Sequence, residues 1–270
     1  MLYKKILLKD VDSRLKDSIA TLRVFISSRN EVTTLRPGML VCPGGGYSFC
    51  SAREAEPIAF RFLSEGFNCF VLDYTVNEKY PAPHLELAIA FNYIREHEKE
   101  FDLIPNSLSI IGFSAGGHLV GSYGFLYKEL GEQLGLNEKQ LRPFTITMAY
   151  PVTLMNEKTH PGTRDIITGG DKNLLLKLDI PSNIKSDYPP TFVWTTKDDD
   201  LVPYENTVEL RDALEANNVR HECHIYESGW HGGSLVNRSV CEKGAIPPKM
   251  KEVRDWASLA ADFIFDALDK

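Results

Sequence analysis

The chain has 270 residues, of which 43% are hydrophobic and 25% are charged, so it can bury a large core. Its formal net charge is −7 and it has no block of lysines and arginines, which argues against nucleic acid or an anionic membrane surface as a partner. The apolar stretch within residues 1–10 is too short for a signal peptide, and no run of about eighteen apolar residues occurs, so we expect a cytoplasmic protein.

Several apolar or β-rich runs have the length and composition of strands. They span residues 22–26, 39–42, 67–73, 108–111, 145–150, 190–196 and 223–226. A helical pattern at residues 52–65 lies between the runs 22–26 and 67–73. Because a strand, helix, strand order favours parallel pairing, we expect these two strands to be parallel.

Two further segments have helical periodicity: one spans residues 84–99, and the other ends the chain. Their apolar stripes consist of Leu87, Ala90, Phe91 and Ile94 in the first segment, and of Val253, Trp256, Ala260, Phe263 and Ala267 in the second. We expect the first helix to cover the sheet through its stripe, and we expect Trp256 to belong to the core.

The run at residues 108–111 leads into Gly112-Phe113-Ser114-Ala115-Gly116, a G-x-S-x-G pattern followed by a helix-compatible stretch. Glycine two positions before and after Ser114 removes the β-carbons that would clash in a sharp turn from strand to helix. Such a turn can hold a serine at the tip of a strand, where its hydroxyl is accessible as a nucleophile. The pattern alone is weak because glycine and serine are common in loops, but three other segments support it.

The first supporting segment is Pro43-Gly44-Gly45-Gly46-Tyr47, which follows the run at residues 39–42. A glycine triplet is also typical of a flexible turn. Here it lies after a strand and upstream of the serine pattern, as does the loop whose backbone N–H groups stabilise an oxyanion in acyl transfer. We assign the donors to Gly45, Gly46 and Ala115, with Pro43 where the common HGGG form of this loop has histidine.

The second supporting segment is the cluster Asp198-Asp199-Asp200, at the end of the run 190–196. A carboxylate at a strand tip can accept the Nδ1 proton of a histidine and stabilise the imidazolium. Asp199 is the preferred candidate because it stands four residues before Pro203, and Asp198 is the second. The remaining acids are expected in a solvated loop or as an N-cap of the helix that begins near Pro203.

The third supporting segment carries His231, which lies between Gly229 and Gly232 after the run 223–226. The resulting chain order of serine, aspartate and histidine is that of α/β-hydrolases, and it differs from the orders in chymotrypsin and subtilisin. The sequence therefore predicts a catalytic triad of Ser114, Asp199 and His231.

Other chemistry-bearing residues are expected to be structural. His118 lies one helical turn after Ser114, where the helix would hold its imidazole beneath the hydroxyl rather than beside it. His221 and His224 would point to opposite faces of a strand and make a poor metal pair. The sequence has neither an H-E-x-x-H motif nor a phosphate-loop motif, so we expect no metal and no cofactor.

The five cysteines include no C-x-x-C pair, which favours reduced thiols over a disulfide framework. Cys42 and Cys69 lie in apolar runs and are expected in the core. Cys50 lies near the glycine loop, where a reactive thiol is one interpretation and an incidental cysteine is the favoured one.

Most of the chain resembles serine esterases of the α/β-hydrolase superfamily, in particular the acetylxylan-esterase-like and carbohydrate-esterase-like branch. The resemblance rests on P-G-G-G-Y at 43–47, G-F-S-A-G-G-H-L at 112–119, P-P-T-F-V-W at 189–194, D-D-x-L-V-P at 198–203 and G-W-H-G at 229–232. It implies an α/β-hydrolase fold, with a mostly parallel central sheet and helices on both faces, in a single domain over residues 1–270. The poorly periodic residues 153–188 are expected to form a small lid insertion, with an ordinary long connection as the alternative.

The predicted activity is that of a serine carboxylesterase acting on short acyl esters, and the resemblance alone implies acetylated xylan fragments or sugars as substrates. An amide hydrolase of the formamidase or small-peptidase type is the alternative enzyme, because the same triad cleaves both kinds of bond. A non-catalytic binding protein on the same fold is the alternative of another class. The sequence leaves open the acyl length, the alcohol moiety and whether the chain forms a homo-oligomer.

Overall fold

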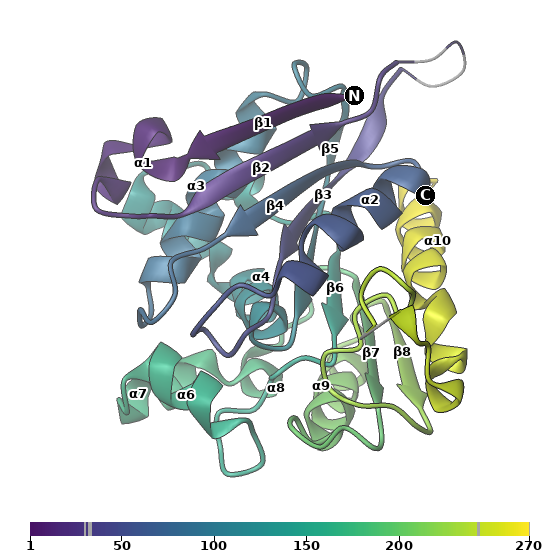
Figure 1. The fold of residues 1–270 in the computed structure, drawn as a ribbon. Coiled ribbons are helices and arrows are strands. Elements are labelled where there is room, and N and C mark those ends of the chain that lie inside the picture. Colours follow the sequence, from purple (N-terminus) through teal and green to yellow (C-terminus); the bar gives the residue numbers. More distant parts are fainter. Residues whose placement is uncertain (30, 32–33, 242–243, 270) are drawn as a thin grey trace.

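An eight-stranded sheet runs through the molecule in the order β1-β2-β4-β3-β5-β6-β7-β8 (Figure 1). Its strands are β1 (Leu2–Leu7), β2 (Thr21–Ile26), β3 (Arg36–Cys42), β4 (Asn68–Asp73), β5 (Leu103–Phe113), β6 (Ile146–Ala149), β7 (Thr191–Thr196) and β8 (His221–Tyr226). In this spatial order, each pair of neighbouring strands from β4 through β3 to β8 is parallel. The pairs β1–β2 and β2–β4 are antiparallel. The computed structural model describes residues 1–29, 31, 34–241 and 244–269.

One expected strand pairing is wrong. β2 pairs with β4 in the antiparallel direction, with Phe25 opposite Cys69. The prediction failed because the crossover helix follows β3 in the chain rather than β2. β3 is accordingly the strand that pairs in parallel with β4, with Met39 opposite Cys69.

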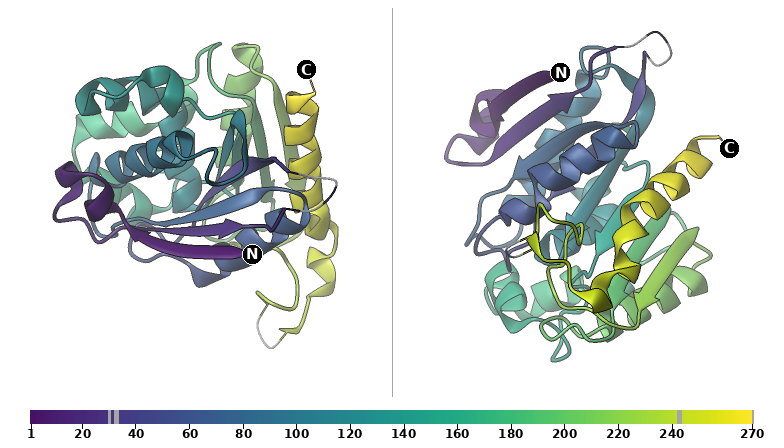
Figure 2. Two further views of the ribbon diagram at one scale, coloured as in Figure 1. Left: turned by 90° about the horizontal axis from the view of Figure 1, so that it is seen from above. Right: turned by 45° about the vertical axis from the view of Figure 1, so that its right-hand side comes forward.

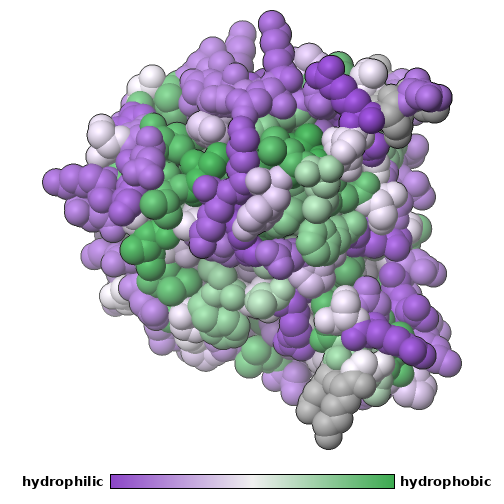
Figure 3. All heavy atoms as spheres, turned by 45° about the horizontal axis from the view of Figure 1, so that its top comes forward, coloured by the Kyte–Doolittle hydropathy of each residue, from purple (hydrophilic) through white to green (hydrophobic). Residues whose placement is uncertain are grey.

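The edge strand β1 has no counterpart among the predicted strands. Its side chains are mostly exposed and include Lys4 and Lys5, so it lacks the apolar pattern of a buried strand. On the face seen in Figure 3, hydrophobic side chains lie between hydrophilic ones. The exposed large hydrophobic residues of β1 are Leu2, Tyr3 and Leu7. Lysines on an edge strand oppose further strand pairing.

Helices flank the sheet on both faces (Figure 2). The α-helices are α1 (Leu8–Val11), α2 (Glu56–Ser64), α3 (Ala82–Glu96), α4 (Ala115–Leu134), α5 (Glu138–Leu141), α6 (Pro161–Thr168), α7 (Lys172–Leu178), α8 (Ile180–Asn183), α9 (Glu205–Ala216) and α10 (Trp256–Leu268). Short 3-10 helices are η1 (Ser13–Leu15), η2 (Ala52–Glu54), η4 (Pro248–Met250) and η5 (Glu252–Asp255). Among the described residues, no helix is both long and apolar enough to cross a lipid bilayer.

Two hydrophobic clusters fill the space between the sheet and its helices. The first contains residues of α3, α4 and α9, such as Leu87, Leu119 and Leu210, and the second contains residues of α2 and α10, such as Phe62 and Trp256. All four apolar residues that predict the buried face of α3 are buried, and Trp256 belongs to the core as predicted. The amphipathic patterns therefore identify both helices correctly.

The helix expected at residues 52–65 is interrupted. The 3-10 turn η2 ends at Glu54, Ala55 adopts φ −109° and ψ −104°, and α2 begins at Glu56. The side chain of Glu54, directly before the break, lies buried in the protein.

Candidate active site

Ser114 occupies a sharp turn between β5 and α4, with φ +52° and ψ −115°. This conformation is strained for a residue with a side chain. A β-carbon on Gly112 would lie 2.1 Å from the carbonyl oxygen of Gly116, and one on Gly116 would lie 2.2 Å from that of Cys42. Both glycines are therefore required for the close approach of β3, β5 and α4, as the sequence pattern predicts.

Three side chains from three separate loops form a hydrogen-bonded chain. Ser114 Oγ lies 2.8 Å from His231 Nε2, and His231 Nδ1 lies 2.8 Å from Asp199 Oδ2. The carboxylate accepts the proton of Nδ1, which leaves Nε2 as the acceptor for the serine hydroxyl. Because parallel strands end at one edge of the sheet, the loops after β5, β7 and β8 meet there, and the structure brings together all three predicted triad residues.

The three consecutive aspartates have different surroundings. The side chain of Asp199 is fully buried, and its Oδ1 accepts hydrogen bonds from the backbone N–H groups of Leu201 at 3.0 Å and Val202 at 2.8 Å. The side chain of Asp198 is 49% exposed and lies 3.8 Å from Lys249 Nζ. Asp200 is exposed at the edge of the cleft that contains Ser114. The geometry thus distinguishes Asp199 from its two neighbours.

The glycine loop lies beside the serine. Gly45 and Gly46 have φ +126° and +64°, and a β-carbon on Gly45 would lie 2.0 Å from the carbonyl oxygen of Phe49. Within the described ranges, the N–H groups of Gly45, Gly46 and Ala115 have no hydrogen-bond acceptor. Ala115 is also the first residue of α4, so its N–H belongs to the positive end of a helix dipole.

Two buried side chains support this loop in the absence of the histidine of the HGGG form. Tyr74 donates its hydroxyl proton to the carbonyl oxygen of Pro43 at 2.8 Å. The backbone N–H of Gly44 donates to Glu54 Oε2 at 2.9 Å. These two contacts hold the loop at Pro43 and Gly44, although the proline side chain provides no hydrogen-bond donor there.

A cleft of about 830 Å³ opens above Ser114 and His231. The cleft is lined by Gly45, Gly46, Arg53 and Glu54. Two apolar side chains also line it, Phe49 with 58% and Leu201 with 48% of its surface exposed. The cleft therefore combines polar groups near the serine with exposed apolar side chains.

Residues 153–188, expected to form an insertion and called the insertion below for brevity, contain α6, α7 and α8. They supply His160, Gly162 and Ile166 to the cleft lining. His160 Nδ1 accepts a hydrogen bond from the backbone N–H of Thr163 at 3.1 Å, so the neutral imidazole carries its proton on Nε2. Burial, together with the nearby His231, lowers the pKa of His160. The insertion thus adds a neutral histidine to the cleft.

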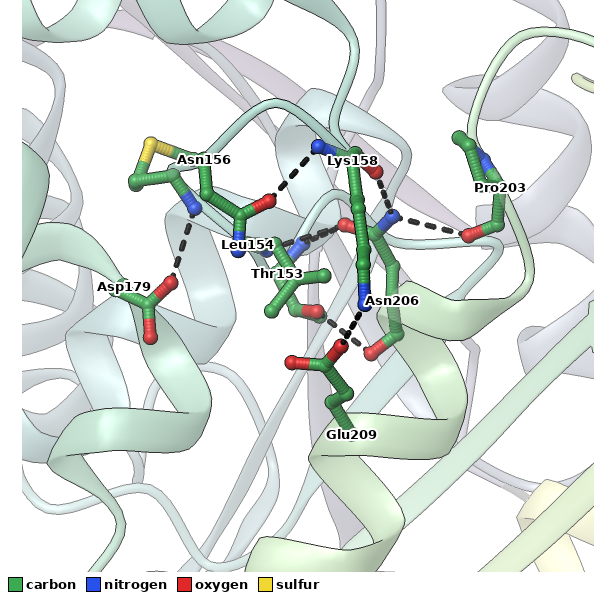
Figure 4. Close-up of polar contacts among 9 residues, drawn as sticks. Thr153, Leu154, Asn156, Lys158, Asp179, Pro203, Asn206 and Glu209 are labelled. Carbon is green, nitrogen blue, oxygen red and sulfur yellow. Dashed lines mark hydrogen bonds and ion pairs between the residues drawn. The ribbon is translucent and has the colours of Figure 1, made fainter.

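Hydrogen bonds of Asn206, two of them buried, fasten the start of the insertion to α9, as Figure 4 shows. Asn206 Oδ1 accepts from the N–H groups of Thr153 at 3.0 Å and Leu154 at 3.1 Å, and its Nδ2 donates to the carbonyl oxygens of Lys158 and Pro203, both at 2.9 Å. All four hydrogen-bonding positions of the buried amide are thereby satisfied. Because Pro203 follows the aspartate loop, this one side chain connects the insertion to the loop that carries Asp199.

His118 is fully buried and does not contact the serine hydroxyl through its ring. Its Nε2 donates to the carbonyl oxygen of Leu178 at 3.0 Å, so Nδ1 accepts from the hydroxyl of Tyr47 at 2.9 Å. Burial lowers the pKa of His118 to about 4. The imidazole thus links the glycine loop to the end of α7 as an uncharged group.

All five cysteines are free thiols. Cys42 and Cys69 are buried in the core as predicted. Burial also raises the pKa of the Cys50 thiol to about 12, which removes the thiolate character that a reactive cysteine needs. Among the described residues, no group of three or more histidine, cysteine or acidic side chains is arranged to hold a metal ion.

Several residues near the site carry no local signal in the sequence. Glu54 lies in a short charged segment that is typical of a solvated helix start, and Tyr150 ends an apolar strand. His160 lies in the poorly periodic stretch before α6. Their positions depend on which distant segments meet, so composition and spacing could not identify them.

The parallel strand order and the serine turn at the end of β5 define an α/β-hydrolase, as the resemblance implied. The chain belongs to the BD-FAE family, whose model matches residues 25–214. It is 30% identical to a protein described as an α/β-hydrolase enzyme from a deep-sea metagenome library of the Medee basin, with a TM-score of 0.77 and coverage of 100% of this chain and 99% of that chain.

Two further similarities are to a protein described as an acetyl ester-xyloside hydrolase and to one described as an acetylxylan esterase. The chain is 31% identical to an acetyl ester-xyloside bifunctional hydrolase from Caldicellulosiruptor lactoaceticus, with a TM-score of 0.80 and coverage of 92% and 88% of the two chains. It is 29% identical over 207 residues to an acetylxylan esterase from Xylanibacter ruminicola, which covers 70% of this chain. The chain spans 39% of that relative's length and 33% of another curated relative's length.

Proposed function

We propose that the protein is a serine carboxylesterase that hydrolyses short acyl esters. The observation that carries this proposal is the chain from Ser114 through His231 to Asp199, with both hydrogen-bonded distances at 2.8 Å, at the floor of the cleft. Membership in the BD-FAE family and the esterases among its relatives support the same reaction.

In the proposed reaction, His231 Nε2 takes the proton of Ser114 while Oγ attacks the ester carbonyl carbon. The oxyanion that forms accepts hydrogen bonds from the N–H groups of Gly45, Gly46 and Ala115. The imidazolium then protonates the leaving alcohol, and the acyl group remains on Ser114. Water, deprotonated by the same imidazole, attacks the acyl-enzyme and releases the carboxylic acid.

The favoured substrates are acetylated sugars or xylan fragments. The named activities of the two carbohydrate-active relatives support this class. The cleft supports it as well, because His160 and Arg53 can hydrogen-bond to sugar oxygens while Phe49 offers an exposed ring to a sugar face. In this proposal, residues 153–188 act as a lid insertion that forms one wall of the cleft.

Substrate profiling tests the reaction and separates it from amide hydrolysis. We expect p-nitrophenyl acetate and acetylated xylooligosaccharides to be cleaved, with rates falling as the acyl chain lengthens, and N-formylkynurenine to be cleaved slowly. Faster hydrolysis of N-formylkynurenine than of every ester would favour the amide hydrolase. Binding of acetylated xylooligosaccharides without hydrolysis of any substrate would favour a binding protein.

Ser114→Ala tests the nucleophile. We expect turnover of p-nitrophenyl acetate to fall by about three orders of magnitude or more with an unchanged circular dichroism spectrum, because the hydroxyl performs chemistry and contributes little packing. A fluorophosphonate should label Ser114 in the wild-type protein. An adduct found by mass spectrometry on another residue, or near-wild-type turnover of the variant, would contradict the mechanism.

A further inference from the structure

A buried carboxyl group lies directly behind the candidate active site. Glu54 is 3% exposed and is the last residue of η2, directly before the break at Ala55. Its Oε2 accepts the backbone N–H of Gly44 at 2.9 Å, and its Oε1 accepts the hydroxyl proton of Tyr150 at 2.6 Å. Both contacts use the carboxyl group as an acceptor, which is the role of an ionised carboxylate.

Tyr150 extends this connection to the histidine. Its hydroxyl oxygen accepts a hydrogen bond from the backbone N–H of Ser234 at 3.1 Å. Ser234 lies three positions after His231 in the chain. Its ring packs edge-to-face against the imidazole of His231, with centroids 5.0 Å apart and planes at 70°. Tyr150, whose own φ is +38°, thus contacts the carboxyl group of Glu54 through its hydroxyl and the imidazole of His231 through its ring.

The packing around the carboxyl group leaves little space for movement. A β-carbon on Gly44 would lie 2.7 Å from Glu54 Oε2 and 3.1 Å from Ser114 Cβ, and one on Gly232 would lie 3.9 Å from Glu54 Oε1. One buried side chain is therefore close to the glycine loop, the serine turn and the residue that follows His231.

Several charged or titratable groups face this region from different segments. Burial raises the pKa of Glu54, whereas the hydrogen bonds from Tyr150 and Gly44 and the nearby His231 oppose that shift. The imidazole of His231 in turn faces Asp199 from the loop after β7 and His160 from the insertion. Arg53, adjacent to Glu54, has its guanidinium group close to Gly232. Glu54 and His231 thus interact electrostatically through the buried region between them.

We propose that Glu54 is a positioning residue for the ester hydrolysis proposed above: its carboxylate holds the glycine loop at Gly44 and, with Tyr150, stabilises the imidazolium of His231. The inference rests on that proposed function. The proton still moves from Ser114 Oγ to His231 Nε2 and then to the leaving alcohol, and Glu54 stays ionised throughout. The stabilisation is electrostatic and arises because a fixed charge in a buried site interacts strongly with a charge that forms nearby.

Glu54→Gln tests the inference because the amide keeps the size of the side chain and removes its charge. We expect kcat for p-nitrophenyl acetate to fall about tenfold or more while KM changes less than about threefold, since the affected interaction strengthens only when the imidazolium forms. The acidic limb of the pH profile of kcat/KM should move to lower pH, because Glu54 interacts electrostatically with His231 and glutamine lacks the charge.

Glu56→Gln is the matched control. It removes the same charge two positions further along the chain, but the side chain of Glu56 is 46% exposed and pairs with Arg23 away from the cleft. We expect its kcat and its pH profile to equal those of the wild-type protein. An equal shift of the acidic limb in both variants would overturn the inference, because it would reflect net charge rather than position.

Tyr150→Phe provides a second test if Glu54→Gln does not fold. It retains the ring against His231 and removes only the hydroxyl that joins Glu54 to Ser234, so we expect a lower kcat with little change in KM. Wild-type kcat in a folded Glu54→Gln or, failing that, in Tyr150→Phe would overturn the inference. If the wild-type protein hydrolyses no ester, the proposed function fails; if it does and these variants match it, the inference about Glu54 fails alone.

Discussion

Asp198, Asp199 and Asp200 show how strongly the surroundings of a residue decide its role. All three are carboxylates in one loop, but the side chain of Asp199 alone is fully buried and receives hydrogen bonds from two backbone N–H groups and from His231. A buried carboxylate with this many donors is fixed in orientation. Asp198 and Asp200 are exposed, where solvent screens their charges.

Asp199→Asn should therefore lower kcat for p-nitrophenyl acetate by about three to four orders of magnitude, because asparagine favours the wrong tautomer of His231. Asp198→Asn and Asp200→Asn are the matched controls and should retain kcat within about threefold. Steady-state kinetics of the three variants check the assignment. Severe loss in Asp198→Asn with normal activity in Asp199→Asn would show that the acid is the neighbouring residue.

At the scale of elements, α4 combines the serine turn at its start with a buried histidine in its first turns. The imidazole of His118 connects the hydroxyl of Tyr47 in the glycine loop with the carbonyl oxygen of Leu178 at the end of α7. The helix thus positions the serine and also joins the two segments that border the cleft. Its histidine is structural in geometry, whereas the histidine beside Ser114 comes from a distant loop.

His118 should make the stability of the fold depend on pH. Its folded-state pKa is lowered to about 4, below the unfolded value of about 6.5, so the unfolded chain binds the extra proton as the pH falls between these values. The free energy of unfolding should therefore fall on going from pH 7 to pH 5, with about 2 kcal/mol arising from this residue. Urea unfolding at both pH values should show a smaller loss for His118→Gln than for the wild-type protein.

The same variant separates the two histidines. His118→Gln should retain the acidic limb of the activity profile, since His231 remains the partner of Ser114, whereas His231→Ala should remove nearly all turnover. Equal pH dependence of stability in His118→Gln and the wild-type protein would contradict the buried neutral imidazole. A folded but inactive His118→Gln beside an active His231→Ala would contradict the proposed triad.

At the scale of the whole molecule, the cleft lies where the carboxyl ends of parallel strands meet the insertion after β6. The insertion is fastened at its start by Asn206, and within it Asp179 Oδ2 accepts the N–H of Met155 at 3.0 Å. Residues such as His160 therefore enter the cleft from a supported segment. The arrangement couples the aspartate loop, the insertion and the serine turn into one assembly.

Asn206→Ala should destabilise the protein by on the order of 3 kcal/mol, because it leaves the two buried N–H groups of Thr153 and Leu154 without their acceptor and removes the side-chain donor to two partly buried carbonyl oxygens. Asn156→Ala, which removes an exposed side chain that accepts the N–H of Lys158, is the control and should cost less than about 1 kcal/mol. Urea denaturation measures both. Equal and small effects would show that the amide of Asn206 does not support the insertion.

The local patterns of this sequence determine much of the fold and the main candidates at the site. Apolar runs identify seven strands, amphipathic stripes identify α3 and α10, and the glycines around Ser114, with the strand-end positions of Asp199 and His231, single out the residues that the structure brings together. These features are readable because each depends on backbone geometry or burial within a few neighbouring residues.

The tertiary structure alone decided the pairing of β2, the edge strand β1 and the surroundings of the site. The crossover helix begins after β3, so β3 is parallel to β4 and β2 is antiparallel to it. Which strands become neighbours depends on how distant strands are ordered in the sheet. Glu54, Tyr150 and His160 have ordinary sequence surroundings, and they gain their contacts only when separate loops meet. Long-range packing sets these contacts, and no local periodicity or spacing encodes it.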